Sequence, residues 1–197
     1  MKEKVIIING SPRKKGYSSQ LAGYISDLLN TNGISNKVFN LYEMNIDYCT
    51  NCGYCSKVRK CRINDDMNEL YELFDDSIST ILISPVAFDG PMAKVKAMVE
   101  RTNVIYHSKY TLNDSLIDRS KKRIGFHIQI GGSPNYPSQF EGGRIINGFF
   151  FKSINAKLRF IMNIDNTDKR NPFEDEIMNN YINPMINSYI NELKELM

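Results

Sequence analysis

The stretch from Val5 to Gln20, VIIINGSPRKKGYSSQ, decides the fold class. It begins with a short β-branched run, Val5–Asn9, which is typical of a strand buried on both faces. After a polar loop, apolar residues recur at helical spacing and predict a helix over Ser18–Asn30. A buried strand, a loop and an amphipathic helix in this order indicate the first half of a βαβ unit.

The remainder of the chain alternates strand-like and helix-like segments in the same way. Further strands are predicted at Lys37–Leu41, Thr80–Ser84, Arg123–Ile130 and Lys157–Ile164. Further helices are predicted at Asp66–Asp76, Met92–Thr102, Glu141–Ser153 and Glu174–Leu196. This alternation predicts an α/β fold with a doubly wound, five-stranded parallel sheet of the flavodoxin-like kind. The strand order of such a sheet, 2-1-3-4-5, is assigned by analogy.

Local signals set several element boundaries. Asp66 and Glu69 have the spacing of a capping box at a helix start. Pro85 is expected to end the third strand, and Gly90-Pro91 to start the helix that follows. Pro184 predicts a kink or a break in the last helix.

Length and composition indicate a single domain over residues 1–197, within which segment 104–122 is the least patterned. That segment is interpreted as a lid, a dimer contact or a plain loop. The net charge of +3, without a long stripe of Lys and Arg, argues against nucleic acid and against a membrane surface as partners. The apolar runs are far shorter than the roughly 20 residues of a membrane span, and no signal segment is present. We therefore expect a cytoplasmic protein.

Ligands of doubly wound sheets bind beyond the carboxyl ends of the strands, and the first loop there is NGSPRKKGYSSQ, residues 9–20. Its serine hydroxyls, its basic residues and the amides at the start of the next helix favour a phosphate site. The loop lacks the endings of a Walker loop and of a dinucleotide fingerprint. A polar turn with a serine cap is an equally good interpretation.

Two further loops fall at the same edge of the predicted sheet. In residues 84–102, the backbone after the strand can hydrogen-bond the polar edge of a planar ring, with Phe88 as an apolar wall. In residues 130–136, two glycines permit close approach of the backbone to a ligand, and Tyr136 is placed to stack or to hydrogen-bond. Taken singly, each is also explained as an ordinary loop or turn.

All four cysteines lie in the short segment CTNCGYCSKVRKC, residues 49–61. Because cytosolic thiols stay reduced, the cluster indicates metal or redox chemistry before a structural disulfide. The spacing C-x2-C-x2-C-x5-C suits a self-contained 4Fe–4S cluster; zinc, or thiols that bind nothing, are the alternatives. Basic residues in and beside the segment either offset a cluster's charge, dock an acidic electron donor, or form a solvated loop. These are Lys57, Arg59, Lys60 and Arg62.

Several motifs occur in an order that resembles the NADPH-dependent FMN reductase family and, within it, the iron–sulfur flavoproteins. They are GSPRKKG at 10–16, the four cysteines, DDM at 65–67, SPV at 84–86, AKVKAMVER at 93–101 and GGS at 131–133. The resemblance covers about residues 4–155. It implies a flavodoxin-like fold, noncovalently bound FMN and one 4Fe–4S cluster.

Site residues follow from this resemblance position by position. It implies that the phosphate is surrounded by Ser11, Arg13, Ser18, Ser19 and Gln20. It implies that the isoalloxazine lies along Pro85, Val86, Ala87 and Phe88, with Gly131, Gly132 and Ser133 opposite. The cluster ligands would be Cys49, Cys52, Cys55 and Cys61. The chain departs from the family at Tyr17, Ser18 and Ser19, where Asn then Thr or Ser is usual, and at Ala87, where Tyr is usual.

These residues together predict an FMN-dependent oxidoreductase that passes electrons between an external carrier, a 4Fe–4S cluster and flavin. The donor would be a ferredoxin-like protein or NAD(P)H, and the assembly a homodimer or a dimer of dimers. One alternative is an NAD(P)H-dependent FMN or quinone reductase without a cluster. Another is a noncatalytic electron carrier or thiol redox sensor. No catalytic side chain is predicted: His107 and His127 lack a partner pattern, and the flavin carries the reaction.

Overall fold

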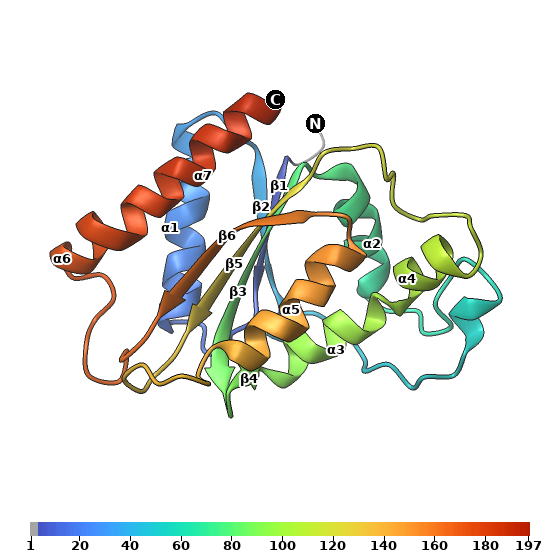
Figure 1. Cartoon of the computed structure of the whole chain (residues 1–197), viewed down its shortest axis with the longest axis horizontal. Helices are drawn as coiled ribbons and strands as arrows, with labels where there is room; N and C mark the ends of the chain where they lie inside the picture. Colours follow the sequence, from blue (N-terminus) through green and yellow to red (C-terminus); the bar gives the residue numbers. More distant parts are fainter. Residues whose placement is uncertain (1–3) are drawn as a thin grey trace.

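The computed structural model describes residues 4–197, so the first three residues of the expected domain lie outside the described part (Figure 1). Parallel strands form the centre of a six-stranded sheet in the order β2-β1-β3-β5-β6. They are β1 (Val5–Asn9), β2 (Asn36–Asn40), β3 (Ser79–Ala87), β5 (Ile124–Ile130) and β6 (Lys157–Ile164). The predicted α/β class with a parallel sheet is confirmed.

The sheet departs from the predicted strand order by one short strand. β4 (Gly90–Pro91) pairs antiparallel with the end of β3 and was not expected. With β4 left out of the count, the five parallel strands follow the expected sequence of neighbours.

Helices cover both faces of this sheet (Figure 1). One face carries α1 (Tyr17–Thr31), α6 (Asp175–Ile177) and α7 (Asn183–Leu196). The other carries α2 (Met67–Asp76), α3 (Ala93–Arg101), α4 (Asn103–Tyr110) and α5 (Glu141–Ser153). Two short 3-10 turns, η1 (Leu41–Glu43) and η2 (Tyr54–Ser56), lie in the connection between β2 and α2.

The β-branched run of β1 explains why the sheet needs both layers. Successive side chains of a strand point to opposite faces. Val5 and Ile7 therefore pack in the core under α1 and α7, whereas Ile6 and Ile8 pack in the core under α2, α3 and α5. Each is fully buried, and burial of such a side chain contributes about 1.5–3 kcal/mol.

The expectations for Pro85 and for Gly90-Pro91 are wrong. β3 continues through Pro85, which pairs with Ile130 of β5, and it ends at Ala87. β1 has already stopped opposite Ile83, so the missing N–H of Pro85 costs no ladder hydrogen bond on that side. Gly90-Pro91 form β4, and α3 begins after them at Ala93.

The capping box at α2 is also wrong. Asp66 has helical dihedral angles and makes no side-chain cap; its Oδ2 accepts the N–H of Asn45 at 2.7 Å. Glu69 pairs with Lys37 instead (Nζ to Oε1, 2.8 Å). Asp65 takes the capping position, since its Oδ1 accepts the N–H of Met67 at 3.2 Å.

The unpatterned segment 104–122 contains most of a helix, α4, which the sequence did not reveal. The buried residues of α4 are the apolar Val104 and Ile105 and, one turn later, the polar Ser108 and Lys109. The Nζ of Lys109 donates to backbone carbonyls at the end of α5, among them Ser153 O. Buried polar residues break the apolar period, and this is why the segment showed no clear helical pattern in the sequence.

The last predicted helix is interrupted as expected from Pro184. A π-helical segment, Met178–Ile182, joins α6 to α7, and Pro184 lies in the first turn of α7. Proline has no N–H for the carbonyl four residues earlier, so the helical hydrogen-bond pattern changes there. Across residues 4–197, no helix has both the length and the apolar character needed to cross a membrane.

Candidate functional site

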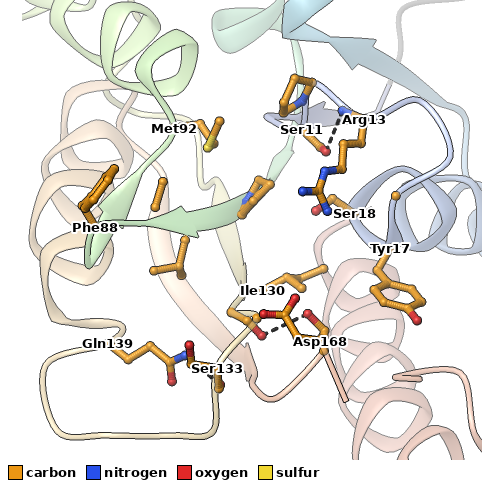
Figure 2. Close-up of a pocket in the computed structure, with 18 of the residues that line it drawn as sticks. Ser11, Arg13, Tyr17, Ser18, Phe88, Met92, Ile130, Ser133, Gln139 and Asp168 are labelled. Atoms are coloured by element: carbon orange, nitrogen blue, oxygen red, sulfur yellow. Dashed lines mark hydrogen bonds between the residues drawn. The ribbon is translucent and has the colours of Figure 1, made fainter. Parts of the chain in front are cut away.

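A cavity of about 690 Å³ opens at the carboxyl ends of the strands (Figure 2). The loops after β1, β3, β5 and β6 line it. Every residue that the sequence assigned to FMN lines this cavity, except Ser19. These residues come from three separate stretches of the chain, so the fold brings together what the sequence predicted as one site.

The loop after β1 is built to leave donors free. Asn9 Oδ1 accepts the N–H of Ser11, and Ser11 Oγ accepts the N–H of Arg13, each at 3.1 Å. α1 then begins at Tyr17, and its N-cap residue, Gly16, provides no side-chain cap. Within residues 4–197, the N–H groups of Tyr17 and Ser18 have no acceptor. Two open amides at a helix start, with Arg13 beside them, are donors of the kind that bind an anion.

Ser19 has a structural place in this loop rather than a place in the cavity. Its hydroxyl donates to the carbonyl of Arg13 at 2.8 Å and accepts from Nδ2 of Asn9 at 2.9 Å. Asn9 Nδ2 also donates to Oδ1 of Asn40 at 2.8 Å. Ser19 therefore ties the loop to the ends of β1 and β2.

The loop after β3 is a tight hairpin whose tip stands at the cavity mouth. Phe88 and Asp89 have φ angles of +50° and +58°, the two left-handed residues of a type I′ turn. The Phe88 side chain is fully exposed, although it lines the cavity, so the expected apolar wall stands at the rim. Asp89 accepts hydrogen bonds from the hydroxyls of Tyr136 and Ser138 across the mouth. These bonds lower the pKa of Asp89 and raise that of Tyr136.

Further cavity residues were missed in the sequence, and two of them follow β6. The carbonyl of Gly131 accepts the hydroxyl of Thr167 at 3.0 Å, and the carbonyl of Gly132 accepts the N–H of Asp168 at 3.0 Å. The polar run DNTD at 165–168 directly after a predicted strand was the signal that could have found them. Gln139 also lines the cavity and donates to the carbonyl of Ser133 at 3.0 Å.

The cavity fits a flavin mononucleotide in size and in chemistry. Its volume lies in the usual range for cofactor sites, about 300–1,000 Å³. Figure 2 shows Ser11, Arg13 and Ser18 together on one side and Phe88 and Met92 on the other. Oε1 of Gln139 is buried without a donor in the described chain, which leaves an acceptor for a ligand N–H or O–H. One end thus offers donors for a phosphate and the rest offers surfaces for a ring.

The four cysteines come together on one curled loop between η1 and α2. All four are free thiols that line a second, smaller cavity together with residues of α3 and α4. Asn51 and Gly53 turn the loop, with φ angles of +50° and +69°. Sγ of Cys49 accepts the N–H of Asn51 at 3.4 Å and lies 4.0 Å from Nδ2 of Asn103.

The thiols differ in how readily they ionise. Burial raises the pKa of Cys55, and the neighbouring Cys61, Cys49 and Cys52 raise it further because their thiolates repel a fourth negative charge. The pKa of Cys52 is lowered, first by the N–H of Tyr54.

The four thiols are gathered on one loop, and thiolate sulfur is a ligand type that suits either zinc or an iron–sulfur cluster. Within residues 4–197, no three side chains of His, Cys, Asp or Glu are placed around one metal-ion position. Zinc draws four thiolates onto one centre, whereas in a 4Fe–4S cluster each iron takes one thiolate. The thiol cavity measures only about 30 Å³, so the loop must open to admit a cluster.

The two histidines differ in their surroundings. His127 is fully buried in β5, where Nδ2 of Asn147 donates to its Nε2 at 2.8 Å. Burial lowers its pKa to about 3, so it is neutral near pH 7 and supplies no proton. His107 lines the thiol cavity, a position that the sequence did not indicate, and its Nδ1 bonds the hydroxyl of Thr111.

Two curated relatives of this chain are both named iron-sulfur flavoproteins. An iron-sulfur flavoprotein of Archaeoglobus fulgidus is 33% identical over 128 residues, which cover 65% of this chain and 62% of the relative. An iron-sulfur flavoprotein of Methanocaldococcus jannaschii is 28% identical over 143 residues, covering 72% and 65%. The chain thus spans less than two thirds of the length of either relative.

Solved structures share the fold at low sequence identity. An NAD(P)H:quinone oxidoreductase from Methanothermobacter marburgensis superposes with a TM-score of 0.69 at 17% identity, over 95% of this chain and 94% of that one. An FMN-dependent NADH-azoreductase from Bacillus anthracis, in complex with FMN, gives 0.63 at 13%, over 98% and 99%.

The family assignment rests on a match to a family model. The model of the family described as NADPH-dependent FMN reductase matches residues 3–118, more than half of the chain. This range contains the loop after β1, the cysteine loop and the hairpin after β3. The chain therefore belongs to the NADPH-dependent FMN reductase family.

Proposed function

We propose that this chain is an FMN-dependent electron-transfer oxidoreductase whose cysteine loop holds a 4Fe–4S cluster. The observation that carries the proposal is the joint presence of two built sites. A flavin-sized cavity with an anion site lies at the strand ends, and four clustered thiols lie at the far end of α3. Family membership supports the flavin, and the names of the relatives support the cluster.

Within the cavity, each group of residues has a separate task. The open amides of α1, with Ser11, Arg13 and Ser18, would hold the phosphate. Pro85, Val86, Ala87 and Phe88 would line one side of the ring, with Gly131, Gly132 and Ser133 opposite. FMN, when bound, supplies the hydride and single-electron chemistry, so the side chains bind and orient it.

The thiols would serve as ligands, one to each iron. A 4Fe–4S cluster supplies single-electron transfer to this site when bound. α3 connects the two sites: Met92, just before it, lines the flavin cavity, and Arg101, its last residue, lines the thiol cavity. Nine residues at about 1.5 Å each separate these positions by roughly 14 Å.

The proposed assembly is a homodimer or a dimer of dimers, with a ferredoxin-like protein or NAD(P)H as donor. Exposed aromatic residues lie on α4 and on the cysteine loop, and these offer a contact surface: Tyr54, Tyr106 and Tyr110. Sedimentation at micromolar concentration tests the assembly. A single species of the monomer mass, 22.7 kDa, would exclude it.

The absorption spectrum of protein purified without oxygen tests the proposed function. Flavin bands together with broad absorption from thiolate-to-iron transitions are expected. Flavin bands alone, with rapid turnover of NADPH, would instead assign a reductase without a cluster. A colourless protein that takes up no FMN on addition would reject both.

A further inference from the structure

Arg101 holds both ends of the cysteine loop from a buried position. The residue is 1% exposed. Its Nη1 donates to the carbonyl of Asp47 at 3.0 Å and to Oδ2 of Asp65 at 2.6 Å. Its Nη2 donates to Oδ1 of Asp65 at 2.9 Å and to the carbonyl of Ile63 at 3.3 Å. Asp47 precedes the first cysteine by two residues, and Ile63 follows the last by two, so one guanidinium closes the base of the loop.

Neighbouring bonds reinforce this base. Oδ2 of Asp65 also accepts the N–H of Asp47 at 3.0 Å. Lys94 lies about two helix turns before Arg101 on α3. Its Nζ donates to the carbonyls of Met44 at 2.9 Å and Ile46 at 3.2 Å. Both ends of the loop are therefore bonded to the same helix, while its apex, including Cys52, remains exposed.

Arg101 also faces the thiols themselves. It lines the thiol cavity, and its Nε is buried without a partner in the described chain. A buried donor left without an acceptor is costly, and it points to an acceptor that is not part of the protein's own hydrogen bonding. An anionic sulfur in the adjoining cavity has the required chemistry.

We propose that Arg101 is a positioning residue for the thiol site. It clamps the two ends of the cysteine loop, and its free Nε–H donates to a thiolate or sulfide sulfur when the site binds metal. The part concerning metal rests on the proposed cluster, whereas the clamp itself concerns only the thiols. Lysine cannot replace arginine here, because only a planar fork bonds a carboxylate and two carbonyls at once.

The test must separate the clamp from simple unfolding. Removing Arg101 alone leaves the carboxylate of Asp65 buried and unpaired, which is destabilising in itself. The informative variant is therefore Arg101→Met with Asp65→Asn, which removes both charges. Lys96→Met with Glu100→Gln is the matched control, since it removes an ion pair of the same helix that does not touch the loop.

Iron content after anaerobic reconstitution with iron and sulfide is the first readout. The double variant is expected to keep FMN binding and a cooperative melt, and to hold iron about 10–100-fold more weakly than wild type. The control is expected to match wild type. Arg101→Lys, which keeps the charge, is expected not to restore iron binding. Wild-type iron binding by a folded double variant, or full rescue by lysine, would overturn the clamp.

The rate at which the metal-free thiols react with a disulfide reagent is the second readout, and it does not require a cluster. In wild type, Cys52 should react first and the less exposed thiols more slowly. In the double variant, all four thiols should react several-fold faster than in wild type, and their rates should become similar. If wild type takes up no iron, and the thiol reaction rates still differ between wild type and the double variant, the clamp is supported and the proposed cluster is rejected. If the double variant fails to fold, the same rates in Arg101→Lys decide: a profile identical to wild type would reject the clamp.

Discussion

Gly132 and Asp168 lie so close that a Cβ added to Gly132 would stand 2.5 Å from Oδ2 of Asp168. The contact joins the loop after β5 to the loop after β6 at the wall of the flavin cavity, and the N–H of Asp168 also donates to the carbonyl of Gly132. The packing of these two loops sets the shape of one side of the cavity.

Gly132→Ala is therefore expected to weaken FMN binding because the Asp168 carboxylate must move. The clashing atoms are the end of a side chain rather than backbone, so the melting temperature should change little. Combining it with Asp168→Ala removes the obstructing group and should restore part of the affinity relative to Gly132→Ala alone. Fluorescence titration with FMN measures all three variants; strictly additive losses would show that the contact does not shape the site.

The loop after β1 is expected to select FMN by its phosphate. Ser11→Ala and Ser18→Ala should weaken FMN far more than riboflavin, since hydrogen bonds to a charged group contribute about 1.5–3 kcal/mol each. Ser188→Ala is the control, because that exposed hydroxyl bonds the carbonyl of Pro184 on α7, away from the cavity. Calorimetric titration with both ligands is the measurement. Equal losses of affinity for FMN and for riboflavin would show that this loop does not bind the phosphate.

His127 is expected to make stability fall in mild acid. Its folded pKa is about 3, against 6.5 for the unfolded side chain, so between these values the unfolded state binds the extra proton. Stability is then complete above pH 6.5 and falls by about 1.4 kcal/mol per pH unit below it. Between pH 6.5 and 5 this amounts to roughly 2 kcal/mol. Denaturant unfolding of wild type and His127→Gln over this range is the measurement, and parallel pH profiles would contradict it.

Elements of the fold could be predicted where their own residues carry the pattern of a strand or a helix, and were missed where they depend on contacts with distant residues. β1 is a continuous β-branched run and α1 has a clear helical period, and the structure places both where the sequence indicated. β4 has two residues and no period, and it forms only because β3 runs past the end of β1. α4 was hidden because its buried Lys109 is satisfied by carbonyls of α5, which a sequence cannot show.

The same reasoning explains what was predictable in the site. Loops that directly follow predicted strands must meet at one edge of a parallel sheet, and half of the residues that line the cavity were assigned to FMN from the sequence. Gln139 was missed because only the packing of the loop after β5 brings it into the wall, whereas Asp168 lies in a polar run directly after a predicted strand that could have indicated it. Arg101 was visible only as part of a helical motif, and its bonds to Asp47 and Asp65 appear once α3 lies against the cysteine loop.

Cys52→Ala and Cys55→Ala are expected to lose iron and sulfide and to keep FMN, because the anion site lies in another loop. Reduction of the flavin by reduced ferredoxin should then fall sharply, whereas direct reduction by NAD(P)H should change little. Stopped-flow absorbance at the flavin bands follows both reactions. Unchanged reduction by ferredoxin after loss of iron would place the cluster outside the electron path.

The central claim, that one chain holds both a flavin and a 4Fe–4S cluster, is tested most directly by a single analysis of composition. Wild-type protein is reconstituted without oxygen, desalted, and assayed together for FMN, iron and acid-labile sulfide. The account predicts about one FMN with about four iron and four sulfide atoms per chain. Protein that binds FMN but retains no iron or sulfide would contradict it.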